Sequence, residues 1–269
     1  MRRTNKHSLF DIILYIAALF IVFPVILLFI WAFVSRWPWP DMLPKYFSLK
    51  GIHALFEKHS TAIPILFSSI LFSLLCTTIA TIIGFLSARA LALYSFKGKT
   101  FFRFASMLPM IISSNVFSMG IHSIFIRWGL NDRAIGVLIC HVIYALPYTV
   151  NILLGTTHQM GTRFEEQAAV LGCGKRKTFI QITFPLAMPG ILATLSMGYI
   201  LSFSQYFITL LIGGGRVITF SMLMVPFISG GDRTVASAYV GLFLLSSLFV
   251  FALFDRLGMK MRKKWEGSI

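Results

Sequence analysis

The chain has 269 residues, of which 57% are hydrophobic and only 12% are charged, and its mean hydropathy is +0.81. An ordinary soluble domain carries about 25% charged residues, so lipid must cover the apolar surface that a core of this size cannot bury. The net charge of +15 would suit nucleic acid, but the basic residues lie in short blocks between apolar runs, as in loops that flank membrane spans. We therefore expect an integral membrane protein with the lipid bilayer, and not nucleic acid, as its surroundings.

Apolar runs recur along the chain at lengths that fit a bilayer, which a helix crosses with about 20 apolar residues. Six such runs are present: 12–34, 62–90, 104–127, 134–155, 186–212 and 236–257. The first is too long for the apolar core of a signal peptide and is expected to be retained. Pro109, Asn115 and His122 interrupt the third, which neighbouring helices can accommodate. The pattern predicts an all-α membrane protein with six transmembrane helices.

The 24 Lys and Arg residues are distributed unevenly among the segments between these runs. About twice as many lie on the side of the N-terminus as on the other side, and basic residues favour the cytoplasm. This bias predicts that both termini are cytoplasmic. It also predicts that the segment between the fourth and fifth runs faces the cytoplasm.

The least apolar long segment is "FEEQAAVLGCGKRKTFIQITFPLAMPGI", at 164–191. Thr162 lies three residues before Glu165, the spacing of a capping box, which predicts a helix that begins at about Arg163. Gly172 can end this helix in a left-handed conformation without steric cost. The polar stretch thus begins with a short, sharply terminated helix.

The rest of the segment, "KRKTFIQITF", predicts a second short helix. We expect Pro185 to stop or kink this helix and Pro189 to begin the next span, because proline lacks the N–H that a helix interior needs. The result is a bent helix–turn–helix with both charged and apolar side chains, as a protein-docking element requires.

Acidic, small, apolar and proline residues recur in this segment at the following positions: Glu166, Ala168, Ala169, Gly172, Phe179, Ile182, Pro185, Pro189 and Gly190. This order resembles the "EAA" loop of binding-protein-dependent ABC transporter permeases, although Gln167 stands where the family usually has the first Ala. In that family the loop, here at about 160–185, forms coupling helices that fit a groove on a cytoplasmic ATPase subunit. The whole chain, 1–269, is then expected to be a single permease domain.

The resemblance implies a set of residues that couple the chain to its ATPase: Glu165, Glu166, Ala168, Ala169, Gly172, Cys173, Gly174, Lys175, Phe179 and Pro185. Two alternatives stay open. Glu165 could serve only as a helix cap, and Lys175 with its two basic neighbours could serve only as positive-inside residues.

Polar residues within the apolar runs are candidates for the substrate pathway: Asn115, Tyr144, Asn151, Ser202, Ser204, Gln205 and Tyr206. Polar groups at this density could equally hold helices together. The stretch "SFSQYFITLLIGG" resembles permeases of the iron, polyamine and phosphonate branch, which often carry an acidic pair where this chain has Ser204 and Gln205. That difference argues against a strongly cationic substrate and favours a neutral or anionic one, such as a phosphonate.

No catalytic or metal site emerges from the sequence. A phosphate-binding loop is not expected at Gly98-Lys99-Thr100, because position 93 is Leu where that motif requires Gly. The three cysteines show no metal-ligand spacing. We therefore expect no cofactor in this chain, with ATP and Mg²⁺ bound by a partner ATPase.

Two other classes of protein fit the sequence less well. A stand-alone ion-coupled transporter commonly uses a carboxylate within a span, and none of the nine acidic residues lies in the middle of one. An intramembrane enzyme would need a base with a partner, whereas His122 and His141 have no obvious carboxylate partner and are expected to make helix–helix hydrogen bonds.

The resemblance therefore implies the permease subunit of an ABC importer in a bacterial inner membrane, without enzymatic activity of its own. Its expected partners are two ABC ATPase subunits, a second permease subunit, similar or identical, and an extracytoplasmic solute-binding protein. The ion-coupled transporter remains the alternative.

Overall fold

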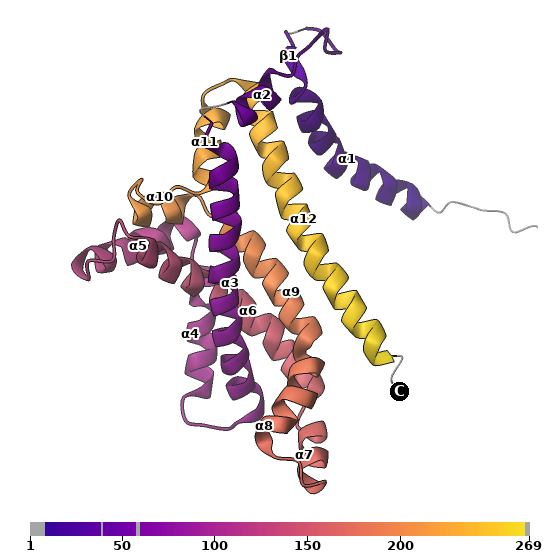
Figure 1. Ribbon diagram of the computed structural model, residues 1–269, viewed down its shortest axis with the longest axis vertical. Coiled ribbons are helices and arrows are strands. Elements are labelled where there is room, and N and C mark those ends of the chain that lie inside the picture. Colours follow the sequence, from indigo (N-terminus) through magenta and orange to yellow (C-terminus); the bar gives the residue numbers. More distant parts are fainter. Residues whose placement is uncertain (1–8, 39, 58–59, 267–269) are drawn as a thin grey trace, which may run out of the picture. The chain divides into compact units, whose positions relative to one another are not determined.

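The computed structural model describes residues 9–38, 40–57 and 60–266 (Figure 1). Helices make up most of the described chain, and two short strands, β1 (Val34–Arg36) and β2 (Tyr46–Phe47), form an antiparallel pair. The predicted all-α class is confirmed. The two ends of the chain, 1–8 and 267–269, which were predicted to be cytoplasmic, lie outside the described residues.

The chain divides into two compact units, Met1–Ile63 with Met224–Leu245, and Pro64–Leu223 with Ser246–Ile269. The single permease domain expected from the sequence stays a prediction.

In the first unit, α1 (Leu9–Trp31) leads into the hairpin and α2 (Lys50–Phe56) follows it. The first span was predicted to continue to residue 34, but α1 ends earlier because Val34 pairs within β1, where its side chain is fully buried. The hydroxyl of Thr234, at the start of α12 (Arg233–Glu266), donates a hydrogen bond of 2.6 Å to the Val34 carbonyl. A pair of residues 200 positions apart thus fixes the end of the first helix.

The second unit is built on α3 (Ala62–Leu93), α6 (Ala134–Met160) and α9 (Phe184–Phe203). Buried side chains from all three helices form one apolar cluster: Phe85, Ala88, Leu91, Val150, Leu153, Leu154 and Ala187. Glycines allow close approach at the contacts, since a Cβ at Gly84 would lie 2.9 Å from the Cβ of Thr149, and a Cβ at Gly190 would lie 2.9 Å from that of Thr156. Small residues at helix contacts are typical of membrane proteins.

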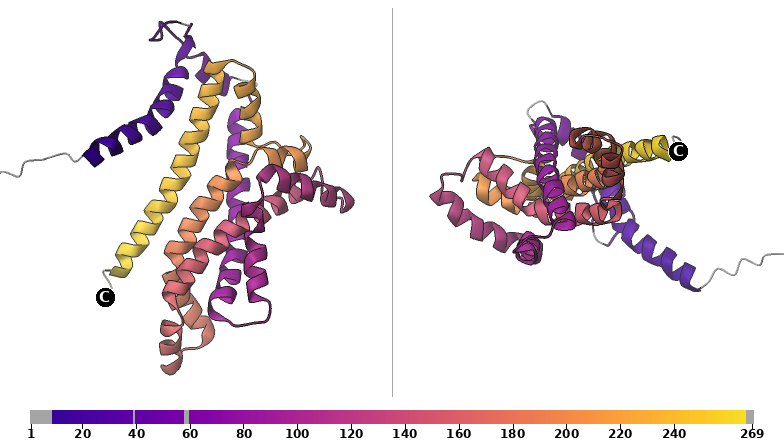
Figure 2. Two further views of the ribbon diagram at one scale, coloured as in Figure 1. Left: turned by 180° about the vertical axis from the view of Figure 1, so that it is seen from behind. Right: turned by 90° about the horizontal axis from the view of Figure 1, so that it is seen from below.

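Five described helices are long and apolar enough to cross a bilayer: Ile13–Trp31, Ala62–Leu93, Ala134–Met160, Lys175–Phe203 and Arg233–Met261. The remaining predicted span, at 104–127, is instead a pair of helices, α4 (Lys99–Ile111) and α5 (Ser114–Arg127), and the chain bends by 110° between them. The extended backbone of Ile112 breaks the helix at this point. Figure 2 shows α5 directed away from α3 and α4, so the chain has six candidate spans only if this pair counts as one.

The fifth span begins earlier and ends earlier than predicted. A continuous helical segment runs from Lys175 through a π-helix, η1 (Phe179–Thr183), into α9, which contains both Pro185 and Pro189. The expectation that Pro189 begins the span is therefore wrong. The wider π turn, in which the Phe184 N–H bonds to the Phe179 carbonyl, lies just before Pro185 and carries the helix into α9. The helix then breaks at 204–206, before α10 (Phe207–Gly213), so a single span over 186–212 is also wrong.

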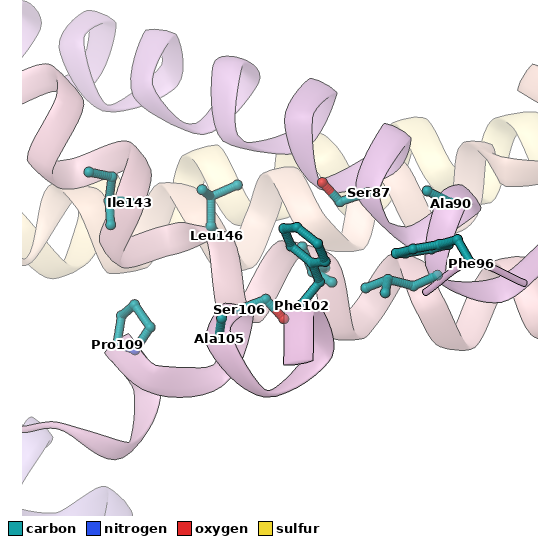
Figure 3. Close-up of a pocket in the computed structure, with 11 residues that line it drawn as sticks. Ser87, Ala90, Phe96, Phe102, Ala105, Ser106, Pro109, Ile143 and Leu146 are labelled. Carbon is teal, nitrogen blue, oxygen red and sulfur yellow. The ribbon is translucent and has the colours of Figure 1, made fainter. Parts of the chain in front are cut away.

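An apolar pocket of about 480 Å³ lies between α3, α4 and α6 (Figure 3). Apart from the hydroxyls of Ser87 and Ser106, its lining is hydrocarbon, including the rings of Phe96 and Phe102. None of the polar residues predicted for the substrate pathway lines it.

Candidate functional site: the 160–185 loop and the break in the fifth span

The 160–185 loop lies at one end of the second unit, where α7 (Arg163–Val170) and α8 (Lys175–Thr178) extend past the last turns of α6 (Figure 1). As predicted, α7 begins at Arg163. Ala168 and Thr178 point inward and are buried. The loop is therefore a packed structure with an inner and an outer face.

Gly172 ends α7 as predicted, with a φ of 77°. Its N–H bonds to the Ala169 carbonyl at 3.0 Å, and the N–H of Cys173 bonds to the Ala168 carbonyl at 2.9 Å. This pair of hydrogen bonds around a left-handed residue is a Schellman motif, which satisfies carbonyls that the helix end would leave free. Gly174 has an extended backbone and no such requirement.

The inner face of α7 is held by Glu165. The guanidinium of Arg89 on α3 donates to both carboxylate oxygens, from Nη1 to Oε1 at 2.9 Å and from Nη2 to Oε2 at 3.0 Å. The hydroxyl of Thr183 in η1 donates to Oε1 at 2.7 Å. Burial acts to raise the pKa of Glu165, but the hydrogen bonds from Arg89 and Thr183 and the charge of Arg89 outweigh it, so the pKa lies below its ordinary value of 4.5.

These contacts correct the interpretation of Glu165 as a helix cap. Within the described chain, the side chain of Thr162 makes no capping hydrogen bond, so the capping box is not formed. The Glu165 carboxylate is instead directed toward α3 and η1, because two donors there outcompete a single backbone N–H.

The outer face of the loop exposes apolar side chains at its tip. Val170 and Leu171 are 89% and 86% exposed, and Phe164 is half exposed. Glu166 is also exposed, unlike its neighbour Glu165, which lies on the inner face of α7. Contiguous exposed apolar residues mark interaction surfaces.

Val170 and Leu171 were not among the predicted coupling residues. Their position in the sequence could have identified them. Both lie directly before Gly172, the glycine that ends α7 in a left-handed turn, and this turn places them at the tip of the loop. The basic residues Lys175, Arg176 and Lys177 lie beyond the turn and are exposed as well.

Phe179 connects the loop to the spans. Its ring centroid lies 6.2 Å from that of Phe85 on α3 and 6.5 Å from that of Phe184 on α9. Pro185 is half-buried in the first turn of α9. Of the predicted coupling residues, the structure thus places Glu165 and Phe179 against the spans and leaves Glu166 on the outside; their roles in coupling stay predictions.

The predicted pathway residues Ser204, Gln205 and Tyr206 form the break between α9 and α10. The Gln205 carbonyl accepts hydrogen bonds from the hydroxyls of Thr209, at 3.0 Å, and Ser221, at 2.9 Å. Side-chain hydroxyls thereby satisfy backbone that the broken helix would leave unpaired.

His141 on α6 spans this break. Its Nδ1 lies 2.9 Å from the hydroxyl of Ser202 and its Nε2 lies 3.0 Å from that of Thr209, and the ring is buried. The prediction that His141 makes helix–helix hydrogen bonds is confirmed. Ser202, predicted for the pathway, is buried in this contact. For His122, the described residues offer no comparable hydrogen bond.

The other predicted pathway residues lie on α5 and α6. Tyr144 and Asn151 are half-buried and share one face of α6 with Tyr148, whose ring lies 6.4 Å from that of Tyr144. Asn115 is exposed on α5, and the ring centroid of Phe117, two residues further along α5, lies 5.9 Å from that of Tyr144. Whether these residues line a pathway stays a prediction.

Among the described residues, no cluster of three or more His, Cys, Asp or Glu side chains could hold a metal ion. The three cysteines are free thiols.

Curated proteins similar to the chain are transport permeases. The spermidine/putrescine transport system permease protein PotC of Haemophilus influenzae is 25% identical over 170 residues, or 63% of this chain and 66% of that protein. A probable sulfate transport system permease protein, cysT, of Helicosporidium sp. subsp. Simulium jonesii is 26% identical over 51% of this chain and 55% of its own length. A putative ABC transporter permease protein of Streptomyces antibioticus is 31% identical over 32% of this chain and 38% of its own length. The chain thus spans less than two thirds of each of these relatives.

Among solved structures, a chain from a bacterial ABC transporter involved in the import of the acidic polysaccharide alginate has a similar fold. Its TM-score is 0.67 at 17% identity, and the match covers 95% of this chain and 99% of that chain. A family model described as "binding-protein-dependent transport system inner membrane component" matches residues 5–263. The chain therefore belongs to the family of inner membrane components of binding-protein-dependent transport systems.

Proposed function

We propose that the chain is the permease subunit of an ATP-driven ABC importer, which forms the solute pathway and docks ATPase subunits on the 160–185 loop. The observation that carries this proposal is the exposed apolar tip of the loop, Val170 and Leu171, on a family member. Apolar side chains at the end of a polar segment are poorly placed for lipid. They are well placed to fill a pocket on another protein.

In this proposal the loop and both termini are cytoplasmic, in line with the excess of basic residues on that side. Two ATPase subunits hold ATP and Mg²⁺, and a second permease subunit completes the pathway. A solute-binding protein delivers the solute from outside. Closure of the ATPase dimer moves the loops, and this movement shifts the population between inward- and outward-facing packings of the spans.

We propose a neutral or anionic solute, because the break in the fifth span carries Ser204 and Gln205 and no carboxylate. The names of the relatives cover both a cationic and an anionic substrate, spermidine/putrescine and sulfate, so they do not choose between these classes. A carboxylate at the pathway would stabilise a polyamine, whereas hydroxyl and amide groups suit uncharged or anionic groups equally.

The test is a mild-detergent purification of the tagged chain from its native membrane, with mass spectrometry of the proteins that accompany it. We expect an ABC ATPase with the wild-type chain and its loss with the double variant Val170→Asp and Leu171→Asp. The matched control is Met42→Asp with Leu43→Asp, two exposed apolar residues of the segment between α1 and α2. That control should keep the ATPase.

Two results would overturn the proposal. If the wild-type chain is repeatedly recovered without an ATPase while still transporting solute, the ion-coupled transporter replaces the importer. If the ATPase remains bound to the tip variant as well as to the control, docking does not depend on the exposed tip.

A further inference from the structure

The two adjacent glutamates of α7 have different surroundings. Glu166 is exposed, whereas the carboxylate of Glu165 accepts three hydrogen bonds from within the chain, two from Arg89 and one from Thr183. These three residues belong to α3, α7 and η1, and Arg89 lies 76 positions from Glu165. The three-residue contact, which we call the Glu165 clamp, therefore joins three segments that the chain brings together only by folding.

The Glu165 clamp is built for a fixed geometry. A guanidinium that donates two parallel hydrogen bonds to a carboxylate fixes both planes, which a single Lys–carboxylate pair does not. The side chains of Arg89 and Glu165 are only 17% and 27% exposed, and Thr183 is buried, so water screens the pair weakly.

Aromatic packing supports the arginine. The Arg89 guanidinium lies 5.9 Å from the centroid of the Phe85 ring, which in turn contacts Phe179 of η1. The same two segments, α3 and η1, are thus connected by rings as well as by the carboxylate. A displacement of α7 alone would break the three hydrogen bonds of Glu165, whereas α3 and η1 stay connected to each other through the Phe85 and Phe179 rings.

We propose that Arg89 and Thr183 are positioning residues, which fix α7 to α3 and η1 through Glu165. When the loop is moved, α7, α3 and η1 then move together, and the second and fifth spans are displaced with them. This inference rests on the proposed function, since it takes the loop to be moved by a docked ATPase. It removes Glu165 from the surface that binds the ATPase and leaves Glu166 there.

The experiment uses the complete complex, purified with its ATPase and placed in lipid nanodiscs. Ser204→Cys introduces an exposed thiol at the break in the fifth span, whereas the native span cysteines Cys76 and Cys140 are buried and the half-buried Cys173 lies in the 160–185 loop. Its labelling by a charged maleimide is measured peptide by peptide with mass spectrometry, with and without ATP plus vanadate. This readout follows the response of the span without requiring the solute to be known.

In this background we compare Arg89→Gln and Glu165→Gln with Lys45→Gln, which breaks an exposed ion pair to Asp41 elsewhere. We expect the ATPase to remain bound and to hydrolyse ATP in all three variants. The ATP-dependent change in labelling should fall by at least about fivefold in the two clamp variants, the lower range of coupling between distant sites, and stay unchanged in the control. Arg89→Lys, which keeps the charge and loses the parallel geometry, should be intermediate.

The exchanged pair, Arg89→Glu with Glu165→Arg, should recover part of the response, which a variant that merely misfolds would not do. The proposal is overturned if both clamp variants respond to ATP like the wild-type complex. It is also overturned if they lose the ATPase and the exchanged pair does not restore it, because the clamp then only shapes the docking surface. Absence of an ATPase from the wild-type complex would instead remove the proposed function itself.

Discussion

Glu165 shows how a residue's role depends on partners that local sequence does not reveal. The capping-box spacing predicted a bond to the backbone three residues earlier, but the carboxylate pairs with Arg89, 76 positions away. Gly172 was predicted correctly because a left-handed helix end is a local feature, set by the absence of a Cβ. Local chemistry could therefore be predicted at this site, and the long-range ion pair could not.

The lowered pKa of Glu165 gives the loop a pH dependence with a definite sign. A carboxyl whose pKa is lower when folded stabilises the fold above its unfolded pKa, and this stabilisation is lost as the pH falls through the folded value. We expect the gap in thermal unfolding midpoint between the wild-type chain and Glu165→Gln to be largest above pH 4.5 and to close below it. Fluorescence-monitored melting in detergent measures this gap.

Glu166→Gln is the matched control, because its side chain is exposed and the substitution should leave the unfolding midpoint close to that of the wild-type chain. A gap between wild type and Glu165→Gln that stays constant down to pH 3 or so would contradict a lowered pKa, since the ionised form would then contribute nothing beyond shape.

Among the helices, His141 of α6 bridges the break between α9 and α10. Its two ring nitrogens bond hydroxyls on either side of the break, Ser202 and Thr209. We expect His141→Leu to lower the free energy of unfolding by about 1–2 kcal/mol, because two buried hydrogen bonds are lost in an apolar setting. Chemical denaturation in detergent, read by circular dichroism, provides the measurement.

His122 offers the comparison, since it lies half-buried on α5 and the described residues give it no hydrogen bond of this kind. His122→Leu should change stability by less than about 0.5 kcal/mol. Equal losses from the two variants would mean that the bonds across the break contribute nothing.

The contact between α6 and α9 depends on the absence of a side chain at Gly190. A Cβ there would lie 2.9 Å from the Cβ of Thr156, so Gly190→Ala should destabilise the chain by about 1–3 kcal/mol through overpacking. Gly155→Ala on α6 meets no atom within 4 Å and should be neutral or slightly stabilising. The same denaturation experiment compares the two, and an equal effect would argue against close helix contact at Gly190.

Helix boundaries were predicted less well than helix existence. Apolar length located most of the long helices, but it missed the bend within 104–127 and the break within 186–212. The π turn at Phe179–Thr183 and the extended Ile112 arise from backbone hydrogen bonding, which hydropathy does not report. Prolines were misleading for the same reason, since α9 contains Pro185 and Pro189 without ending.

At the scale of the whole molecule, composition and loop charge predicted a helical membrane protein, and the loop motif predicted the family that the chain belongs to. The division into two units and the β1–β2 hairpin were not predicted. Both depend on pairings such as Val34 with Thr234, which the order of apolar runs does not encode.

The exposed tip of the 160–185 loop has a consequence for biogenesis in the proposed importer. In that proposal, Val170 and Leu171 would face the cytosol as exposed apolar side chains before assembly, and exposed apolar surface makes an unassembled subunit prone to aggregation and a target for chaperones. The ATPase that covers them would then also protect the permease from turnover. The same surface that docks the ATPase would thus make the stability of the permease depend on the amount of ATPase that the cell makes.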